Sequence, residues 1–399
     1  MSEWVVKNLD EVVEYFIDYR GKTPNKKDSG IPLITAKIVK DGRLNTATEF
    51  ISVEDYPLWM TRGYPEVNDV VLTTEAPLGE VALIKNKNVA LAQRIITLRG
   101  YKNILDNKFL KYWLQSEQGQ YELESRASGT TVFGIKSSIL KKIPIFLPPY
   151  NEQVAISSVL YCIDEKIDLL HRQNKTLESM AETLFRQWFI EGAQEDWPET
   201  TIGEVFTLNG GSTPSTKNED FWDGDIFWTS PRDLSGSESI FLMSTERKIT
   251  PLGLKRISSG LLPVRTLLMS SRAPIGYLSI TDIPVAINQG YIAIRESSHY
   301  HSEYMYLWCK LNMEKIKNSG NGSVFQEISK SSFRDLTFIE PPKEKVESFN
   351  ELTRDLFEKN RLNTKQIRRL ENLRDTLLPK LMSGEVQVQY AEETIASVA

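Results

Sequence analysis

Apolar residues follow two kinds of pattern along the chain, and the two kinds alternate. Short β-rich runs punctuated by Gly and Pro predict strands. These runs are 69–73, 89–91, 266–269 and 291–294. Each pair of runs precedes a predicted helix, near 109–123 and 302–316, and then a Pro-Pro step that opens a much longer helical segment. The pattern therefore predicts a globular unit, a long helix, a second globular unit and a second long helix.

The long helical segments each carry an apolar seam at spacings of three and four residues, which is typical of a coiled coil. The predicted seam is Leu160, Ile163, Ile167, Leu170, Asn174, Leu177 and Leu184 in the first helix, and Leu356, Asn363, Ile367, Leu370 and Leu377 in the second. We expect the two seams to pair antiparallel, with Asn174, Asn360 and Asn363 fixing the register. A homodimeric coiled coil is the alternative.

The two halves of the chain repeat one another at an offset of about 190 to 197 residues, too long for a solenoid repeat. The matched segments keep their order. They are 20–24 with 210–214, 31–35 with 226–230, 76–79 with 273–276, 92–94 with 288–290, 129–133 with 321–325, and 148–149 with 341–342. A conserved order at nearly constant spacing indicates an internal duplication.

The predicted fold class is α/β (α+β). Two similar mixed α/β domains are joined by two long helices that form an antiparallel coiled coil, with pseudo-twofold symmetry between the halves. The predicted boundaries are 1–150 for the first domain, 151–190 for the central helix, 191–342 for the second domain, 343–384 for the C-terminal helix and 385–399 for a tail.

Composition adds few constraints. The 399 residues are 40% hydrophobic and 25% charged, with two cysteines and no apolar run of the ~20 residues that a membrane helix needs. We therefore expect a cytoplasmic protein without a disulfide framework. The net charge of −5 argues against nucleic acid, but basic clusters at 20–43 and 247–272 fall in different copies of the repeat. Either cluster alone is also consistent with a solvated face.

Catalytic signatures are missing from the sequence. The three histidines lack zinc-site spacing, and there is no phosphate-binding loop with a lysine. The segment 147–150, Leu-Pro-Pro-Tyr, resembles an amino-methyltransferase motif, but Leu147 cannot hold an exocyclic amine as the polar residue of that motif does. We interpret Pro-Pro as the start of the long helix, and we predict no catalytic residue and no metal site.

The duplicated segments resemble those of type I restriction–modification specificity subunits. The resemblance is carried by 210–217, 221–234, 270–276 and 288–290, and more loosely by 21–24, 76–79 and 92–93. It implies that each domain reads one half of a bipartite target in double-stranded DNA. It also implies that the helices set the spacing and dock two methyltransferase (M) subunits, joined by motor-nuclease (R) subunits. S-adenosylmethionine would then bind to the methyltransferase, and this prokaryotic cytoplasmic chain would bind no cofactor.

Candidate DNA contacts follow from side-chain chemistry. A Gln can pair with an adenine edge through two hydrogen bonds, and an Arg can read guanine or meet a phosphate. The predicted contacts are Lys22, Thr23, Lys26, Lys37, Gln93 and Arg94 in the first domain, and Gly211, Thr213, Ser215, Lys217, Thr229, Ser230, Arg232, Arg272 and Gln289 in the second. Turn capping by the amides and surface salt bridges are the structural alternatives. Trp222, Phe227 and Trp228 are interpreted as core residues.

Two other functions remain open at this point. One is a coiled-coil scaffold with two protein-binding heads and no DNA role, against which the paired basic clusters argue. The other is a self-sufficient restriction or modification enzyme, which the missing motifs disfavour.

Overall fold

A computed structural model describes residues 4–129, 133–272, 274–320, 326–386 and 388. The matched segments 129–133 and 321–325, Ala273 and most of the tail 385–399 lie largely outside these residues. The chain divides into two compact units. The first unit comprises Met1–Lys166 and Arg369–Ala399, and the second unit comprises Ile167–Arg368. Each unit thus holds one globular domain together with part of both long helices.

The first unit is built on an antiparallel sheet in the order β2-β10-β7-β8. Beside it, β3 pairs parallel with β9 and antiparallel with β6, while β1 pairs with β11 and β4 with β5. Its strands are β1 (Val5–Asn8), β2 (Val13–Asp18), β3 (Ile31–Ile34), β4 (Val39–Lys40), β5 (Arg43–Leu44), β6 (Phe50–Ile51), β7 (Val70–Thr74), β8 (Leu78–Leu83), β9 (Ala90–Leu91), β10 (Ile95–Gly100) and β11 (Pro144–Leu147). Its short helices are α1 (Leu9–Val12), α2 (Asp55–Trp59), α3 (Asn107–Gln115), α4 (Glu117–Ser125) and α5 (Ser137–Leu140).

The second unit is built on a sheet in the order β13-β20-β17-β18-β15, with a smaller sheet β16-β14-β19 and the pair β12-β21. Its strands are β12 (Glu199–Thr201), β13 (Leu208–Gly210), β14 (Trp222–Thr229), β15 (Phe241–Leu242), β16 (Arg247–Ile249), β17 (Leu267–Ser271), β18 (Ile275–Thr281), β19 (Ala286–Ile287), β20 (Tyr291–Ile294) and β21 (Thr337–Ile339). Its short helices are α7 (Ile202–Val205), η2 (Glu219–Phe221), α8 (Pro231–Leu234), α9 (Pro251–Leu254), α10 (Ser302–Leu311), α11 (Met313–Asn318) and α12 (Lys330–Arg334).

The two units have the same strand order, which confirms the duplication. The order β2-β10-β7-β8 corresponds to β13-β20-β17-β18. The parallel pairs also correspond, because β3 pairs with β9 as β14 pairs with β19. The four predicted strand runs are present as β7, β9, β17 and β20. Each predicted short helix is divided in two, as α3 and α4 or as α10 and α11. A Cβ on Gly119 would lie 2.1 Å from the Trp113 carbonyl oxygen, so the chain folds back closely after α3.

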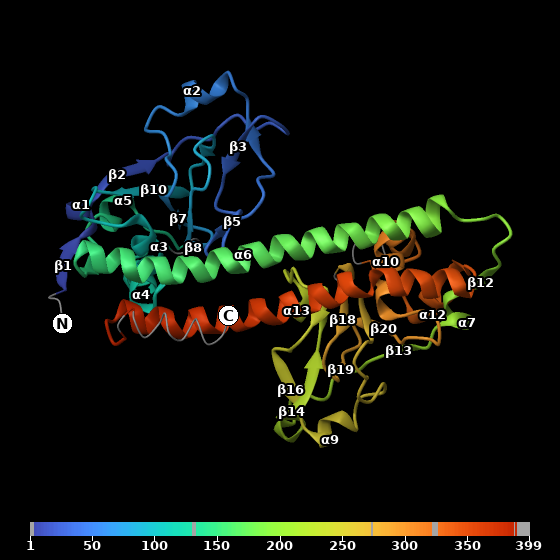
Figure 1. The fold of residues 1–399 in the computed structure, drawn as a ribbon. Helices are drawn as coiled ribbons and strands as arrows, with labels where there is room; N and C mark the ends of the chain where they lie inside the picture. The colour runs from blue at the N-terminus through green and yellow to red at the C-terminus, as the bar shows by residue number, and fades with distance from the viewer. Residues whose placement is uncertain (1–3, 130–132, 273, 321–325, 387, 389–399) are drawn as a thin grey trace. The chain divides into compact units, whose positions relative to one another are not determined.

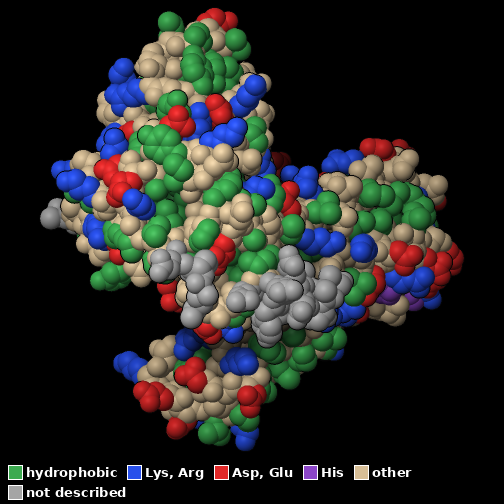
Figure 2. All heavy atoms as spheres, turned by 60° about the vertical axis from the view of Figure 1, so that its left-hand side comes forward, with side chains coloured by type: hydrophobic (Ala, Val, Ile, Leu, Met, Phe, Trp, Pro, Cys, Tyr) green, Lys and Arg blue, Asp and Glu red, His purple; other side chains and the backbone are tan. Residues whose placement is uncertain are grey.

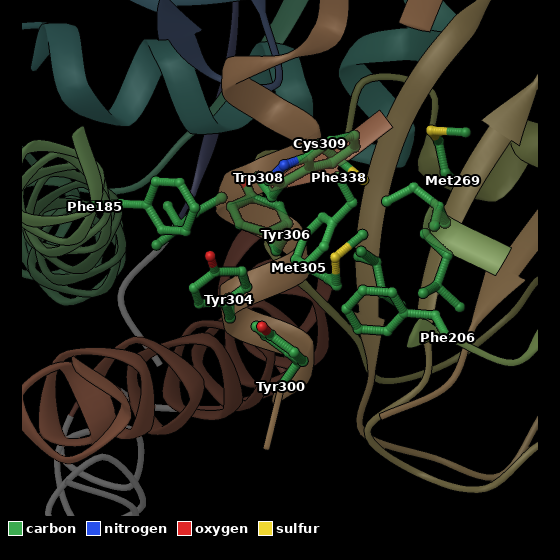
Figure 3. Packing of buried hydrophobic residues seen from close by; sticks show 14 of the residues in the cluster. Phe185, Phe206, Met269, Tyr300, Tyr304, Met305, Tyr306, Trp308, Cys309 and Phe338 are labelled. Atoms are coloured by element: carbon green, nitrogen blue, oxygen red, sulfur yellow. The ribbon is translucent and has the colours of Figure 1, made fainter. Parts of the chain in front are cut away.

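Aromatic residues dominate the core of the second unit (Figure 3). Tyr304 on α10 lies edge-on to Phe185, with ring centroids 4.9 Å apart, and Phe338 on β21 lies edge-on to Phe206 at 5.6 Å. Such edge-to-face pairs add to the stabilisation that burial gives. Phe185 and Phe349 of the long helices belong to this core, so the domain packs directly on the helices.

The long helices are α6 (Tyr150–Arg186) and α13 (Lys343–Met382), and each begins directly after its Pro-Pro step, as predicted (Figure 1). Within the second unit, Asn174 pairs with Asn363, and Trp188 lies against Phe349 with ring centroids 6.0 Å apart. The residue number falls along α13 as it rises along α6, so the two helices are antiparallel. In the first unit, Arg374 on α13 reaches Asp164 on α6 at 3.2 Å.

The seam is as predicted in most of its length. Leu160, Ile163, Ile167, Leu170, Asn174, Asn363, Ile367, Leu370 and Leu377 are all buried. Leu177, Leu184 and Leu356 are only partly buried. Toward the end of α6, Ala181 is buried, but Phe185 and Phe189 are buried in place of Leu184. The heptad phase predicted for this end was therefore wrong beyond Ala181. A π-helical turn, η1 (Gln187–Glu191), follows α6.

The predicted register asparagines lie together inside the second unit. The Asn363 amide donates to Asn174 Oδ1 at 3.0 Å and the Asn360 amide donates to the Asn174 carbonyl at 3.2 Å. The Asn174 amide donates to Thr364 Oγ1 at 3.3 Å. A one-residue slip would bury these amides against apolar neighbours, so the cluster favours a single register.

Candidate nucleic-acid interface

In each domain two short parallel strands end at the same edge of a small sheet, and the predicted glutamines follow that edge. The Ala92 amide donates to the Ile34 carbonyl at 2.9 Å, just past β9 and β3. The Asn288 amide donates to the Thr229 carbonyl at 3.0 Å, at the equivalent point past β19 and β14. Gln93 and Gln289 therefore occupy matching positions, and Gln289 is exposed while Gln93 is partly exposed.

In the second unit the loop after β13 packs tightly against the end of β19. A Cβ on Gly211 would lie 2.0 Å from the Ile287 carbonyl oxygen, so only glycine allows this approach. The Ser212 amide donates to that same carbonyl at 3.1 Å. The indole of Trp222 donates to the Ser215 carbonyl at 3.1 Å. These contacts fix the loop on both sides of Thr213, whose hydroxyl donates to Gln289 Oε1 at 2.6 Å.

The matching loop of the first unit is held differently. Gly21 has a φ of 85° and an added Cβ would meet nothing within 4 Å, so the loop is not pressed against a strand end. The Arg20 guanidinium donates to the Ile135 carbonyl at 2.7 Å. Lys22 stands where the second loop has Ser212, and Lys22 and Thr23 are exposed. The two loops share a sequence pattern but differ in how closely they pack against a strand end.

Four of the predicted cationic contacts take part in ion pairs. The nitrogen–oxygen distances are 2.8 Å for Lys26–Glu49, 3.3 Å for Arg94–Glu75, 3.7 Å for Arg232–Glu246 and 3.9 Å for Arg272–Glu327. In the absence of DNA, these four side chains therefore form surface salt bridges, which was the structural alternative to DNA contact. All four pairs are solvent-accessible, and such pairs contribute only about 0–1 kcal/mol, so a phosphate can displace the carboxylate at little cost.

Other cations, in the basic clusters and in the loop after β13, are exposed and accessible to a ligand. Lys22, Lys27, Lys37 and Lys217 are exposed and make no ion pair with the described residues. In the second unit Arg247 stacks on Trp222, with Cζ 3.4 Å from the ring centroid, and Lys248 lies 5.0 Å from the centroid of Phe227. Stacking holds Arg247 in one orientation without neutralising it. On the face shown in Figure 2, Lys and Arg side chains are interspersed with Asp and Glu.

Thr229 does not lie on the surface, so its predicted role as a DNA contact is corrected. Its side chain is 0% exposed and faces Asp233 and the hydroxyl of Tyr291. Trp228 and Thr229 are consecutive in β14 and both buried, so both faces of the strand are covered at this end. Ser230 is partly exposed, but its backbone amide and its hydroxyl donate to Asp233 as the N-cap of α8. Ser230 thus orients the turn that carries exposed Arg232.

Trp222 and Trp228 are buried, as predicted, with 6% of each side chain exposed. Phe227 is partly buried against the same domain. The side-chain stacking of Arg247 on Trp222 was not predicted. It depends on the pairing of β14 with β16, which the sequence does not give.

Each domain is linked to the helices by ion pairs between charged groups that are mostly only partly buried. In the first unit Lys111 and Tyr112 donate to Asp164 Oδ2, at 2.5 and 2.7 Å. Burial raises the pKa of Asp164, but Lys111, Tyr112 and Arg374 outweigh that effect and hold its pKa below the ordinary value. In the second unit Asp282 pairs with Arg361 at 3.0 Å.

Within the described ranges, no helix is both long enough and apolar enough to span a bilayer. Over the same ranges, His, Cys, Asp and Glu side chains form no group of three or more that could hold a metal ion.

Comparison with known proteins identifies the duplicated domain. The model of the type I restriction modification DNA specificity domain matches twice, at residues 1–179 and 194–372. A type I restriction enzyme MjaIX specificity subunit of Methanocaldococcus jannaschii is 37% identical over 165 residues, which are 41% of this chain and 38% of that protein. A putative MjaX specificity subunit of the same organism is 20% identical over 97% of this chain and 95% of its own length.

A solved structure shares the fold. The type I restriction–modification system S subunit from M. genitalium aligns with a TM-score of 0.55 at 19% identity, over 95% of this chain and 96% of that one. The two family matches together cover most of the chain. The chain therefore belongs to the type I restriction modification DNA specificity family, and it is a non-catalytic DNA specificity subunit of a type I restriction–modification enzyme.

Proposed function

We propose that each globular domain reads one half of a bipartite DNA target at its strand-end loops. The observation that carries this proposal is that the same elements recur in both domains at the same sheet edge, with Gln93 past β9 and Gln289 past β19. At this edge Gln289 is exposed and Gln93 is partly exposed, and each domain also carries exposed cations. Base edges and phosphates require such a combination. Two domains with different loops would read two different half-sites.

The remaining roles extend this proposal to the complex. The antiparallel helices set the gap between the half-sites and dock two methyltransferase subunits, and motor-nuclease subunits complete the restriction enzyme. S-adenosylmethionine belongs to the methyltransferase, which modifies adenine. The complex acts in the cytoplasm of a prokaryote, where its target DNA is located.

A binding experiment separates this function from a protein-binding scaffold. The chain is purified with a methyltransferase subunit from the same host and titrated with a duplex carrying the methylated target. We expect a complex whose affinity falls steeply as salt rises, because phosphate contacts release counterions. If the duplex has the same electrophoretic mobility with and without the protein at low salt, the result favours the protein-binding scaffold.

Gln289→Ala is expected to abolish or alter recognition of the second half-site only. A bidentate base contact provides about 1–3 kcal/mol of discrimination. The measurement is methylation by the complex on duplexes with single changes in each half-site, with Gln93→Ala as the matched variant in the first domain. If Gln289→Ala leaves both the methylated sequence and its rate as they are, the reading role is wrong.

Neutralising an available lysine is expected to weaken binding to every duplex. Lys27 and Lys217 are counterparts in the repeat, and Lys27→Gln and Lys217→Gln should each lower the slope of log affinity against log salt by about 1. Lys102→Gln is the control, because exposed Lys102 follows the opposite end of β10 from Arg94. If neither substitution changes this slope, the two lysines do not contact DNA phosphates.

A further inference from the structure

We propose that Thr213 is a positioning residue that holds Gln289 in the orientation in which it reads its base. This inference rests on the proposed function and gives Thr213 a role through Gln289 rather than a phosphate contact of its own. The Thr213 hydroxyl lies 2.6 Å from Gln289 Oε1 across 76 residues of chain. The two residues belong to different loops that meet at the edge of β14 and β19.

Both ends of this hydrogen bond stand on fixed backbone. On the Thr213 side, the Ser212 hydroxyl donates to the Arg256 carbonyl at 3.0 Å and accepts from the Ser258 amide at 3.1 Å. The indole of Trp228 donates to the Ser212 carbonyl at 3.4 Å. The backbone that carries Thr213 is therefore held in place. The hydrogen bond from Thr213 orients the Gln289 amide, and not the reverse.

The backbone around Gln289 is equally restrained. Asn288 donates its amide to Thr229, and the Asn288 side chain accepts the Gly290 amide at 2.8 Å. The Gly290 carbonyl accepts the Ser271 amide at 2.8 Å. Only the side-chain torsions of Gln289 remain free, and these are what the Thr213 hydrogen bond restricts. The rotamer entropy of an exposed glutamine is thus lost before DNA binds, which favours association.

The hydrogen bond also defines the face that Gln289 presents. With one lone pair of Oε1 taken by Thr213, the amide nitrogen keeps both of its donors and makes no hydrogen bond with the described residues. The remaining lone pair of Oε1 can still accept from a base. A fixed donor beside an acceptor matches adenine, which offers N7 and the N6 amino group in the major groove.

The first domain provides an internal comparison. Thr23 and Gln93 are the counterparts of Thr213 and Gln289, but among the residues the structure describes no hydrogen bond joins them. Lys22 replaces Ser212 and cannot make its two loop contacts. We therefore expect the hydroxyl of Thr213, and not that of Thr23, to affect the choice of base.

The test uses the full chain in complex with its methyltransferase and a set of duplexes that vary one base pair at a time through both half-sites. Thr213→Val removes the hydroxyl with little change of shape, Thr213→Ser keeps it, and Thr23→Val is the matched control. We expect Thr213→Val to lower discrimination at one base pair of the second half-site about tenfold. Thr213→Ser should restore the discrimination, and Thr23→Val should leave both half-sites unchanged.

Non-additivity with Gln289→Ala gives an independent measurement. Thr213→Val combined with Gln289→Ala should lose no more discrimination than Gln289→Ala alone, because Thr213 acts only through the glutamine. A uniform loss of affinity over all duplexes would show a phosphate contact and overturn the positioning role. Unchanged discrimination in Thr213→Val, with Gln289→Ala still defective, would overturn it too. Failure of the wild-type complex to favour any split target would instead overturn the proposed function on which it rests.

Discussion

Gly211→Ala is expected to abolish recognition of the second half-site while the first half-site is still read. The added Cβ would lie 2.0 Å from the Ile287 carbonyl oxygen and 2.5 Å from that of Asn288. Both atoms belong to the backbone, so the clash is relieved only if the loop leaves the end of β19. Overpacking of this kind costs about 1–3 kcal/mol, and the displaced loop separates Thr213 from Gln289.

Gly210→Ala is the matched control, because a Cβ at Gly210 would meet nothing within 4 Å. We expect its free energy of unfolding to stay within about 0.5 kcal/mol of the wild type. The measurement is methylation on duplexes altered in one half-site at a time, together with thermal unfolding. Equal recognition of both half-sites by Gly211→Ala and Gly210→Ala would mean that the loop geometry does not matter for reading.

Asp164→Ala is expected to destabilise the first unit by about 3–5 kcal/mol, because it removes the carboxylate that the buried Lys111 ammonium contacts. The Lys111 side chain is 3% exposed and lies 2.5 Å from Asp164. Hydrogen exchange at the amides of α3 measures the local loss of stability. Glu165→Ala is the control, because its ion pair with Lys85 is exposed and contributes about 0–1 kcal/mol. Equal protection of α3 in the two variants would contradict the anchoring role.

The same carboxylate predicts a pH dependence. The pKa of Asp164 is lower in the folded chain than in the unfolded chain. The carboxylate therefore contributes fully to folding stability above its pKa in the unfolded chain, and this contribution is lost as the pH falls through its pKa in the folded chain. The stability difference between the wild type and Asp164→Asn should therefore be constant near neutrality and shrink below about pH 4. A difference that grows on acidification would show that the protonated form is the one favoured by folding.

Local signals in the sequence were sufficient for the larger features of the fold. The Pro-Pro steps identify the starts of α6 and α13, because proline fits the first turn of a helix but not its interior. The heptad spacing predicts most of the buried seam, and the asparagines on it meet as expected. The duplicated order of segments predicts that the two domains share one topology.

Other features depend on contacts between distant residues and could not be read from the sequence. The burial of Thr229 depends on which face of β14 is covered by Tyr291. The seam shifts to Phe185 and Phe189, whose rings both pack against Tyr304 of α10. The ion pair between Arg94 and Glu75 forms only because β7 ends beside the start of β10.

The most direct test of DNA specificity is a genome-wide map of adenine methylation in the host, with and without this gene. We expect one split motif, two short blocks around a fixed unspecified gap, to lose methylation on deletion. We also expect reintroduced Gln289→Ala to change only one block of that motif. Methylation that stays the same at every motif after deletion, while the host's type I methyltransferase is still expressed and active, would contradict the assignment of this chain as the subunit that selects the target.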